Sequence, residues 1–220
     1  MVKIYLVRHC EAEGNKAKIF QGTTDCDISE TGEMQLAFLK ERFKNTHIDK
    51  VYSSPLTRAY KTANAVAEDK DLEIITHKGF IEIDGGVVEG MPFKKIFSDY
   101  AELERVWNEE PQNFHPENGE SMRQVYDRAG KALESLANDP QNQGKTLLVA
   151  THGAVTKCLL CRVLYGDIEK LVTVDWSNNT AVSLLICDDN GMRLEFYNDN
   201  SHIPEDFVPA DVTKMWTEDN

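Results

Sequence analysis

Five side chains of this sequence suit the transfer of a phosphoryl group: Arg8, His9, Arg58, Glu82 and His152. A guanidinium can bind two phosphate oxygens at once, and a neutral imidazole can attack phosphorus. A carboxyl group can protonate the departing oxygen and later accept a proton from water. Each residue alone is more often structural than catalytic, so the hypothesis requires a fold that brings all five together.

Short apolar segments precede these residues and predict strands, of which the first and the fourth are expected to be buried in the sheet. Such segments occur at 3–7, 50–53, 72–76 and 146–150. Arg8 and His9 follow the first segment, and His152 follows the fourth. Because ligands bind at the carboxyl ends of the strands in open α/β sheets, we expect the five side chains to meet there.

Helical patterns alternate with these strands. An amphipathic helix is expected after Gly32, and a second is expected from Ser54 as N-cap and Pro55 as first residue to about Asp69. A capping box at 121–124 begins a third helix, and a fourth should run from Gly153 to about Leu164. The segments 181–187 and 192–197 flank an Asp-Asn-Gly turn and predict a hairpin.

The alternation of strands and helices predicts an α/β fold, a three-layer sandwich with a largely parallel central sheet. We expect a single domain over residues 1–220. The segment from about 79 to 119 mixes glycines, prolines and aromatic residues, and is expected to form a helical lid that selects the substrate. The polar segment from about 201 to 220 is expected to form a C-terminal tail.

Composition argues against several classes of partner. The 220 residues carry a formal net charge of −13, which repels nucleic acid and anionic membrane surfaces. No apolar stretch approaches the ~20 residues of a membrane span, and the apolar start is too short for a signal segment, so a cytoplasmic protein is expected. An anionic substrate must therefore meet a local cationic pocket.

The cysteines and the other histidines give no metal site. Five irregularly spaced cysteines in a chain of this length argue against a disulfide framework. Cys158 and Cys161 match a Cys-x-x-Cys pair, but they lie within an apolar helix and no second pair completes a zinc site, so they are expected to be buried structural residues. Spacing typical of metal ligands is also absent at His47, His77, His115 and His202. Neither a metal nor another cofactor is predicted.

Several separated motifs carry a family resemblance. In chain order they are Leu6-Val7-Arg8-His9-Cys10-Glu11, Asn15, Gln21-Gly22, Ser53-Ser54-Pro55-Leu56-Thr57-Arg58-Ala59 with Thr62-Ala63, Glu82 with Glu89-Gly90, Gly119-Glu120-Ser121 and Thr151-His152-Gly153. From residue 3 to about 165 the chain resembles the histidine phosphatase superfamily, which includes the cofactor-dependent phosphoglycerate mutases. The resemblance implies a phosphoglycerate mutase-like fold.

The resemblance also implies a role for individual residues. His9 is the implied nucleophile and Glu82 the implied proton donor, with Glu120 as a competing candidate. Residues implied in binding phosphate or the rest of the substrate are Arg8, Asn15, Gln21, Gly22, Arg58, His152 and Gly153. The implied reaction is metal-independent hydrolysis of a phosphate monoester of a small metabolite, because arginines can stabilise the transferred group and water can displace a phosphohistidine.

The sequence departs from the family's motifs at three positions. Cys10 replaces the glycine that usually follows Arg-His, and we favour a small packed side chain over a redox switch at this position. Gly14 stands where the family often has an aromatic residue, and Val88 stands where it commonly has tryptophan. Contacts to the part of the substrate outside the phosphate are therefore expected to differ.

Two other functions stay open, a phosphomutase and a non-catalytic regulatory module. The Arg-His-Tyr-Gly segment that follows the acid in cofactor-dependent mutases is missing, and Asp84 and Glu89 oppose a second phosphate, although Lys94 and Lys95 add positive charge. A regulatory module has no reason to keep the complete catalytic set. The sequence does not identify the substrate or the oligomeric state.

Overall fold

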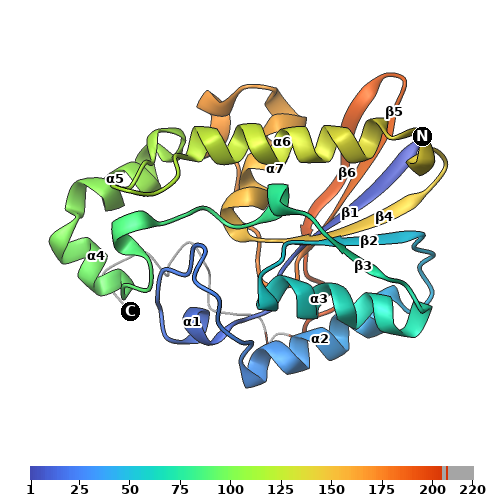
Figure 1. Ribbon diagram of the computed structural model, residues 1–220, viewed down its shortest axis with the longest axis horizontal. Helices are drawn as coiled ribbons and strands as arrows, with labels where there is room; N and C mark the ends of the chain where they lie inside the picture. Colours follow the sequence, from blue (N-terminus) through green and yellow to red (C-terminus); the bar gives the residue numbers. More distant parts are fainter. Residues whose placement is uncertain (205–206, 208–220) are drawn as a thin grey trace.

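The computed structural model of the chain describes residues 1–204 and 207. Their strands form one six-stranded sheet in the order β3-β2-β4-β1-β5-β6 (Figure 1). The strands are β1 (Val2–Arg8), β2 (Lys50–Ser53), β3 (Ile74–Thr76), β4 (Thr146–Thr151), β5 (Val182–Asp188) and β6 (Gly191–Asp199). Every strand predicted from a short apolar segment is present, and β5 and β6 form the predicted hairpin.

The sheet is mixed, with a parallel part and an antiparallel edge. β1 pairs in parallel with β4, β4 with β2, and β2 with β3, whereas β5 runs antiparallel to β1. In the register of β1 and β4, Arg8 lies opposite Thr151, so these two strands end together at one edge. The predicted α/β sandwich with a largely parallel sheet is confirmed.

Helices cover both faces of the sheet (Figure 1). One face is covered by α6 (Met122–Asn138) and α7 (Gly153–Tyr165), and the other by α2 (Glu30–Phe43) and α3 (Thr57–Ala67). Successive β1 side chains point to opposite faces: Ile4 and Leu6 join the apolar cluster beneath α6 and α7, and Val7 joins the cluster beneath α2 and α3. Burial on both faces explains why β1 and β4 read as nearly continuous apolar runs.

The segment predicted as a helical lid contains α4 (Phe93–Asp99) and α5 (Ala101–Glu109), which lie beyond the end of α6 (Figure 1). It is joined to the loop after α1 (Glu13–Lys16) by backbone hydrogen bonds from Phe20 to Met91 at 2.9 Å and from Phe93 to Lys18 at 3.0 Å. Short 3-10 helices occur at Glu68–Lys70, Lys78–Phe80, Gly86–Val88, Pro111–Asn113, Pro140–Asn142 and Ile168–Thr173. The helical character of this segment is as predicted.

The predicted start of α3 is wrong. The helix begins at Thr57, and Leu56 occupies the cap position without a side-chain hydrogen bond. Ser54 does not cap the first turn of this helix: its hydroxyl accepts a hydrogen bond from the N–H of Leu56, before the helix begins, at 3.3 Å, and lies 2.7 Å from Nε2 of His152, on a different strand end. The side chain that the local pattern assigned to a helix cap thus combines a bond within the preceding turn with a tertiary contact.

The N-caps of α2 and α6 follow local sequence rules. α2 begins two residues before Gly32 rather than after it, because the Ser29 hydroxyl accepts a hydrogen bond from the Gly32 N–H. α6 carries the predicted capping box, in which the Ser121 hydroxyl accepts from the Gln124 N–H and the Gln124 side chain accepts from the Ser121 N–H.

The remaining predictions about the chain have mixed outcomes. All five cysteines are free, and Cys158 and Cys161 are fully buried in α7, as predicted. Among the described residues, no helix combines the length and apolar character needed to cross a bilayer. Of the predicted tail, residues 205–206 and 208–220 lie outside the described part of the chain. The single-domain assignment and the cytoplasmic location stay predictions.

The capping box of α6 generates a stability prediction. We expect Ser121→Ala to lower the free energy of unfolding by about 1 kcal/mol, because the first turn of the helix loses its side-chain acceptor. Ser135→Ala, at an exposed interior position of the same helix, should leave stability unchanged or raise it slightly. Urea unfolding monitored by circular dichroism measures both, and equal effects would contradict a capping role.

Candidate active site

A pocket lies at the edge of the sheet where β1 and β4 end. It is lined by Arg8, His9, Asn15, Ile19, Phe20, Gln21, Gly22, Arg58, Glu82, Ile83, Phe93, Trp107, Gly153, Ala154 and Trp176. Eight of the nine predicted site residues are among these, and the ninth, His152, is not. The fold therefore gathers side chains from β1, α3, the segment after β3 and the start of α7.

His9 is held by both its backbone and its ring. Its N–H donates to the Thr151 carbonyl at 2.8 Å, which fixes it to the end of β4. Its Nδ1 lies 2.6 Å from the Cys10 carbonyl oxygen, and since a carbonyl only accepts, Nδ1 carries the proton and Nε2 carries the lone pair. Burial, together with the charges of Arg58 and Arg8, lowers the pKa of His9 well below its usual value, so the ring is neutral at pH 7.

Two buried guanidinium groups face the same pocket. Arg8 donates to the carbonyl of Ser177, and Arg58 donates to the carbonyl of Gly22 at 2.8 Å, but the Nε–H of each has no partner among the described residues. Burial lowers the pKa of Arg8 to about 10 and lowers that of Arg58, while the nearby Glu82 carboxylate opposes both shifts. Donors that are buried and unpaired suit an anion with several oxygens, such as phosphate.

His152 lies behind His9 rather than in the pocket wall. It is fully buried, its ring centroid is 5.2 Å from that of His9, and its Nε2 contacts the Ser54 hydroxyl. Its Nδ1 has no partner within the described part of the chain. Burial, Arg58 and His9 lower the pKa of His152 well below the usual value, so this ring is also neutral. Its direct contact with phosphate stays a prediction.

Glu82 reaches the pocket from the segment between β3 and the lid. Its two carboxylate oxygens accept hydrogen bonds from the backbone N–H groups of Ile83, at 3.0 Å, and Ala154, at 3.2 Å. Ala154 lies in the first turn of α7, where N–H groups point out of the helix and favour a negative charge. The carboxylate acts on the charges of Arg8 and Arg58, which places it beside the expected phosphate.

Helix α1 and the loop after it bring Asn15, Gln21 and Gly22 to the pocket. Gly22 has no room for a side chain, because a Cβ there would lie 1.8 Å from a carboxylate oxygen of Glu89. A Cβ at Gly14 would lie 2.3 Å from the Gln21 side chain. Gly14, one of the positions where the sequence departs from the motifs, therefore leaves space for the side chain of Gln21.

Glu89 has a structural role that the sequence did not reveal. Its carboxylate accepts hydrogen bonds from the backbone N–H groups of Thr23, Thr24 and Gly85, at 2.8, 3.1 and 2.7 Å. These contacts join the pocket loop to the segment that follows Glu82. Glu89 thus holds these two segments together. The opposition of its charge to a second phosphate, expected from the sequence, is a separate effect.

Four aromatic side chains of the pocket were not predicted as site residues: Phe20, Phe93, Trp107 and Trp176. Trp107 and Trp176 are stacked, with ring centroids 5.0 Å apart, and Lys157 Nζ lies 4.8 Å from the Trp176 ring centroid. The aromatic content of the predicted lid was a usable signal for Phe93 and Trp107. No local pattern marked Trp176, which comes from the segment between α7 and β5.

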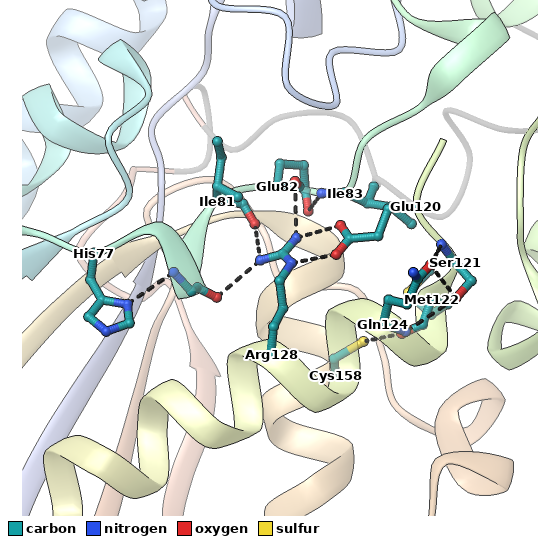
Figure 2. A network of polar contacts seen from close by, with 11 residues as sticks. His77, Ile81, Glu82, Ile83, Glu120, Ser121, Met122, Gln124, Arg128 and Cys158 are labelled. Atoms are coloured by element: carbon teal, nitrogen blue, oxygen red, sulfur yellow. Dashed lines mark hydrogen bonds and ion pairs between the residues drawn. The ribbon is translucent and has the colours of Figure 1, made fainter. Parts of the chain in front are cut away.

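Glu120, the competing candidate for proton donor, is engaged elsewhere. Figure 2 shows both of its carboxylate oxygens facing the guanidinium of Arg128, at 2.6 and 2.7 Å. Glu120 is also not among the residues that line the pocket. This geometry favours Glu82 for proton transfer.

Cys10 is packed rather than poised for oxidation. It is fully buried, its N–H donates to the Thr62 hydroxyl at 3.0 Å, and burial raises the pKa of its thiol to about 12. A protonated, buried thiol reacts slowly with oxidants, which supports the packing interpretation. Within residues 1–204 and 207, no group of three or more His, Cys, Asp or Glu side chains is arranged to hold a metal ion.

Comparisons with known proteins cover the whole site. A family model described as the histidine phosphatase superfamily (branch 1) matches residues 4–200. "Phosphoserine phosphatase 1" of Hydrogenobacter thermophilus is 36% identical over 213 residues, 96% of this chain and 98% of that protein. "Probable phosphoglycerate mutase GpmB" of Escherichia coli is 33% identical over 169 residues, 74% of this chain and 75% of that protein. The solved structure of a mutant phosphoserine phosphatase from Entamoeba histolytica in complex with phosphoserine is 28% identical, covers 93% of this chain and 100% of that chain, and has a TM-score of 0.79.

The lowered histidine pKa values generate a prediction about pH and stability. An unfolded histidine titrates near a pKa of about 6.5, and His152 titrates lower when folded, so the unfolded state binds more protons as the pH falls below that value. The contribution of the neutral His152 to the free energy of unfolding is therefore fully present above about pH 6.5 and is lost progressively below it.

We expect His152→Asn to flatten this dependence, by an amount that approaches about 1.4 kcal/mol per pH unit for one proton. Urea unfolding at a series of pH values between about 7 and 5.5 measures the slope in this window. Ser135→Ala changes no titratable group and serves as the control, because its slope should match that of the unmodified protein. An unchanged slope in His152→Asn would show that this histidine is not held neutral by the fold.

Proposed function

This chain belongs to the histidine phosphatase superfamily and is a phosphatase of phosphate monoesters, and we propose that its reaction passes through a phosphohistidine formed on His9. The observation that carries the proposal is the state of the His9 ring. The Cys10 carbonyl holds the proton on Nδ1, and burial beside Arg58 and Arg8 keeps the ring neutral. Nε2 therefore has its lone pair available in a cationic pocket.

In the first step, the His9 Nε2 lone pair attacks phosphorus and the bond from phosphorus to the ester oxygen breaks. The Arg8 and Arg58 guanidinium groups stabilise the charge on the transferred oxygens, which is the main requirement of phosphoryl transfer. Glu82, as the carboxylic acid, gives its proton to the ester oxygen, so the substrate leaves as an alcohol.

In the second step, water attacks the phosphohistidine. Glu82, now a carboxylate, accepts a proton from the water as the new bond to phosphorus forms and the bond to Nε2 breaks. The products are inorganic phosphate and a neutral His9, so both residues return to their starting states. Because arginines supply the positive charge, we propose that hydrolysis needs no divalent metal.

The substrate is proposed to be a phosphate monoester of a small metabolite. The Hydrogenobacter thermophilus and Entamoeba histolytica relatives that align over most of this chain are both phosphoserine phosphatases, and the second was solved in complex with phosphoserine. Phosphoserine is therefore the first ester to test. Gln21, Gly22 and the aromatic wall are proposed to contact the part of the substrate outside the phosphate.

A phosphomutase is the second candidate, and the similarity to a probable phosphoglycerate mutase favours it. A mutase must hold a second phosphate while its intermediate reorients, which requires further cations around the pocket. Among the described residues that line the pocket, the only arginines or lysines are Arg8 and Arg58, while Lys94 and Lys95 are exposed on α4. This supports water as the usual acceptor.

Phosphorylation of His9 is the first prediction of this function. Rapid quenching of turnover with labelled phosphoserine or p-nitrophenyl phosphate should trap an acid-labile, base-stable phosphoprotein, because the label is then bonded to an imidazole nitrogen. His9→Ala should form no adduct. The same adduct in His9→Ala, together with its loss in His152→Asn, would assign the nucleophile to His152 instead.

The choice between phosphatase and mutase gives a second prediction. We expect 3-phosphoglycerate, if it reacts, to give inorganic phosphate and glycerate, because no second phosphate site is evident in the described pocket. Phosphorus NMR distinguishes these products from 2-phosphoglycerate directly. Rapid formation of 2-phosphoglycerate with little free phosphate, stimulated by 2,3-bisphosphoglycerate, would make the mutase the leading function.

A further inference from the structure

Arg128, a residue of α6 outside the pocket wall, donates hydrogen bonds from all of its guanidinium nitrogens. Nε and Nη2 contact the two carboxylate oxygens of Glu120 at 2.6 and 2.7 Å. Nη1 donates to the carbonyls of Gly79, at 3.0 Å, and Ile81, at 2.7 Å, and Nη2 donates to the carbonyl of Glu82 at 3.1 Å. Figure 2 shows the guanidinium between Glu120 and the backbone that carries Glu82.

The backbone from Gly79 to Glu82 belongs to no strand. Its carbonyl groups accept hydrogen bonds from side chains, where a strand would bond to the backbone of a neighbouring strand. Four consecutive carbonyl groups accept hydrogen bonds there, three of them from Arg128. The fourth, that of Phe80, accepts from the Thr151 hydroxyl at 2.8 Å. Thr151 ends β4 directly before His152, so this backbone is fixed between α6 and the edge of the sheet that carries the site.

Glu120 extends the same arrangement beyond Glu82. Its N–H donates to the carbonyl of Asp84 at 2.9 Å, and its carboxylate pairs with Arg128. The side chains of Arg128 and Glu120 are 23% and 19% exposed, so water does not replace these contacts freely when one partner is removed. The pair therefore holds the chain on both sides of Glu82.

The placement of the Glu82 carboxyl depends on this backbone. A general acid must lie within about 2.6 to 3.2 Å of the oxygen that it protonates, so a small displacement of the main chain removes the contact. We propose that Arg128, together with Glu120, is a positioning residue for Glu82, and that protonation of the leaving group depends on its fork of donors. This inference rests on the proposed role of Glu82 as the proton donor.

Arg128→Lys removes the set of guanidinium donors on Nε, Nη1 and Nη2 but keeps the positive charge. Lysine has three donors on one nitrogen and cannot reach the carboxylate and three carbonyls together. We compare kcat/KM, which reports the steps up to departure of the alcohol and not the hydrolysis of the phosphohistidine that both substrates share. It should fall about 10-fold or more for phosphoserine, whose alkoxide is a poor leaving group, and less than about 3-fold for p-nitrophenyl phosphate.

Glu82→Gln shows the effect of removing the proton donor itself. It should also slow the hydrolysis of phosphoserine far more than that of p-nitrophenyl phosphate. The double variant separates positioning from general damage. If Arg128 acts through Glu82, adding Arg128→Lys to Glu82→Gln should lower the phosphoserine rate by less than about 2-fold further, because the two changes remove the same function.

Arg162→Lys is the matched control. Arg162 of α7 forms a comparable ion pair with Glu134 of α6, with Nε and Nη2 at 2.9 and 2.8 Å from the same carboxylate oxygen, and its side chain is 30% exposed. It does not line the pocket. This variant should therefore leave the ratio of the two rates unchanged, even if thermal unfolding shows a loss of stability.

The outcomes separate the two hypotheses. If Arg128→Lys lowers both rates equally while Glu82→Gln shows the selective loss, Arg128 is only structural and the positioning role is wrong. If Glu82→Gln shows no selective loss, the proton-donor role of Glu82 itself is wrong. Should Arg128→Lys fail to fold, Glu120→Gln decides: a selective loss of phosphoserine turnover supports the proposal, and an unchanged ratio of rates overturns it.

Discussion

The burial of two guanidinium groups without a carboxylate ion-pair partner is the constraint on which the site depends. Neither Arg8 nor Arg58 takes part in an ion pair among the described residues, and backbone carbonyls satisfy only part of their donors. Burying a charge in this way costs free energy, which an anion entering the pocket would offset. Burial lowers the pKa of His9, and the same positive charges lower it further, so the ring is neutral and therefore nucleophilic. The buried arginines thus contribute both to anion binding and to activation of the nucleophile.

A chain with a net charge of −13 can keep such a pocket only if nearby carboxylates are engaged elsewhere. Glu89 accepts hydrogen bonds from three backbone N–H groups, and Glu120 is paired with Arg128. Both lie close to Glu82 in the fold, yet Glu82 is the only carboxylate side chain among the described residues that line the pocket. Acidic residues around the site therefore hold the loops in place and leave one carboxyl for proton transfer.

Much of the fold and of the site could be predicted because both depend on local sequence. Strands buried on both faces must be apolar throughout, so β1 and β4 were recognisable as short runs. Arg8 and His9 follow β1 directly, and chain connectivity alone places them at its carboxyl end. The capping box of α6 was equally readable, since both of its partners lie within one helical turn. Predictions of this kind need no knowledge of distant contacts.

The sequence by itself determined the α/β class, the strand ends and the types of side chain available for phosphoryl chemistry, because connectivity and apolar patterning set these features. Only the tertiary structure decided which partner each side chain takes. Ser54 contacts His152 instead of capping α3, Trp176 joins the pocket from a segment without a motif, and Arg128 binds a backbone segment more than forty residues before it. The physical reason is that hydrogen bonds and ring contacts form between groups that are close in space, and no local pattern encodes a distance across the fold.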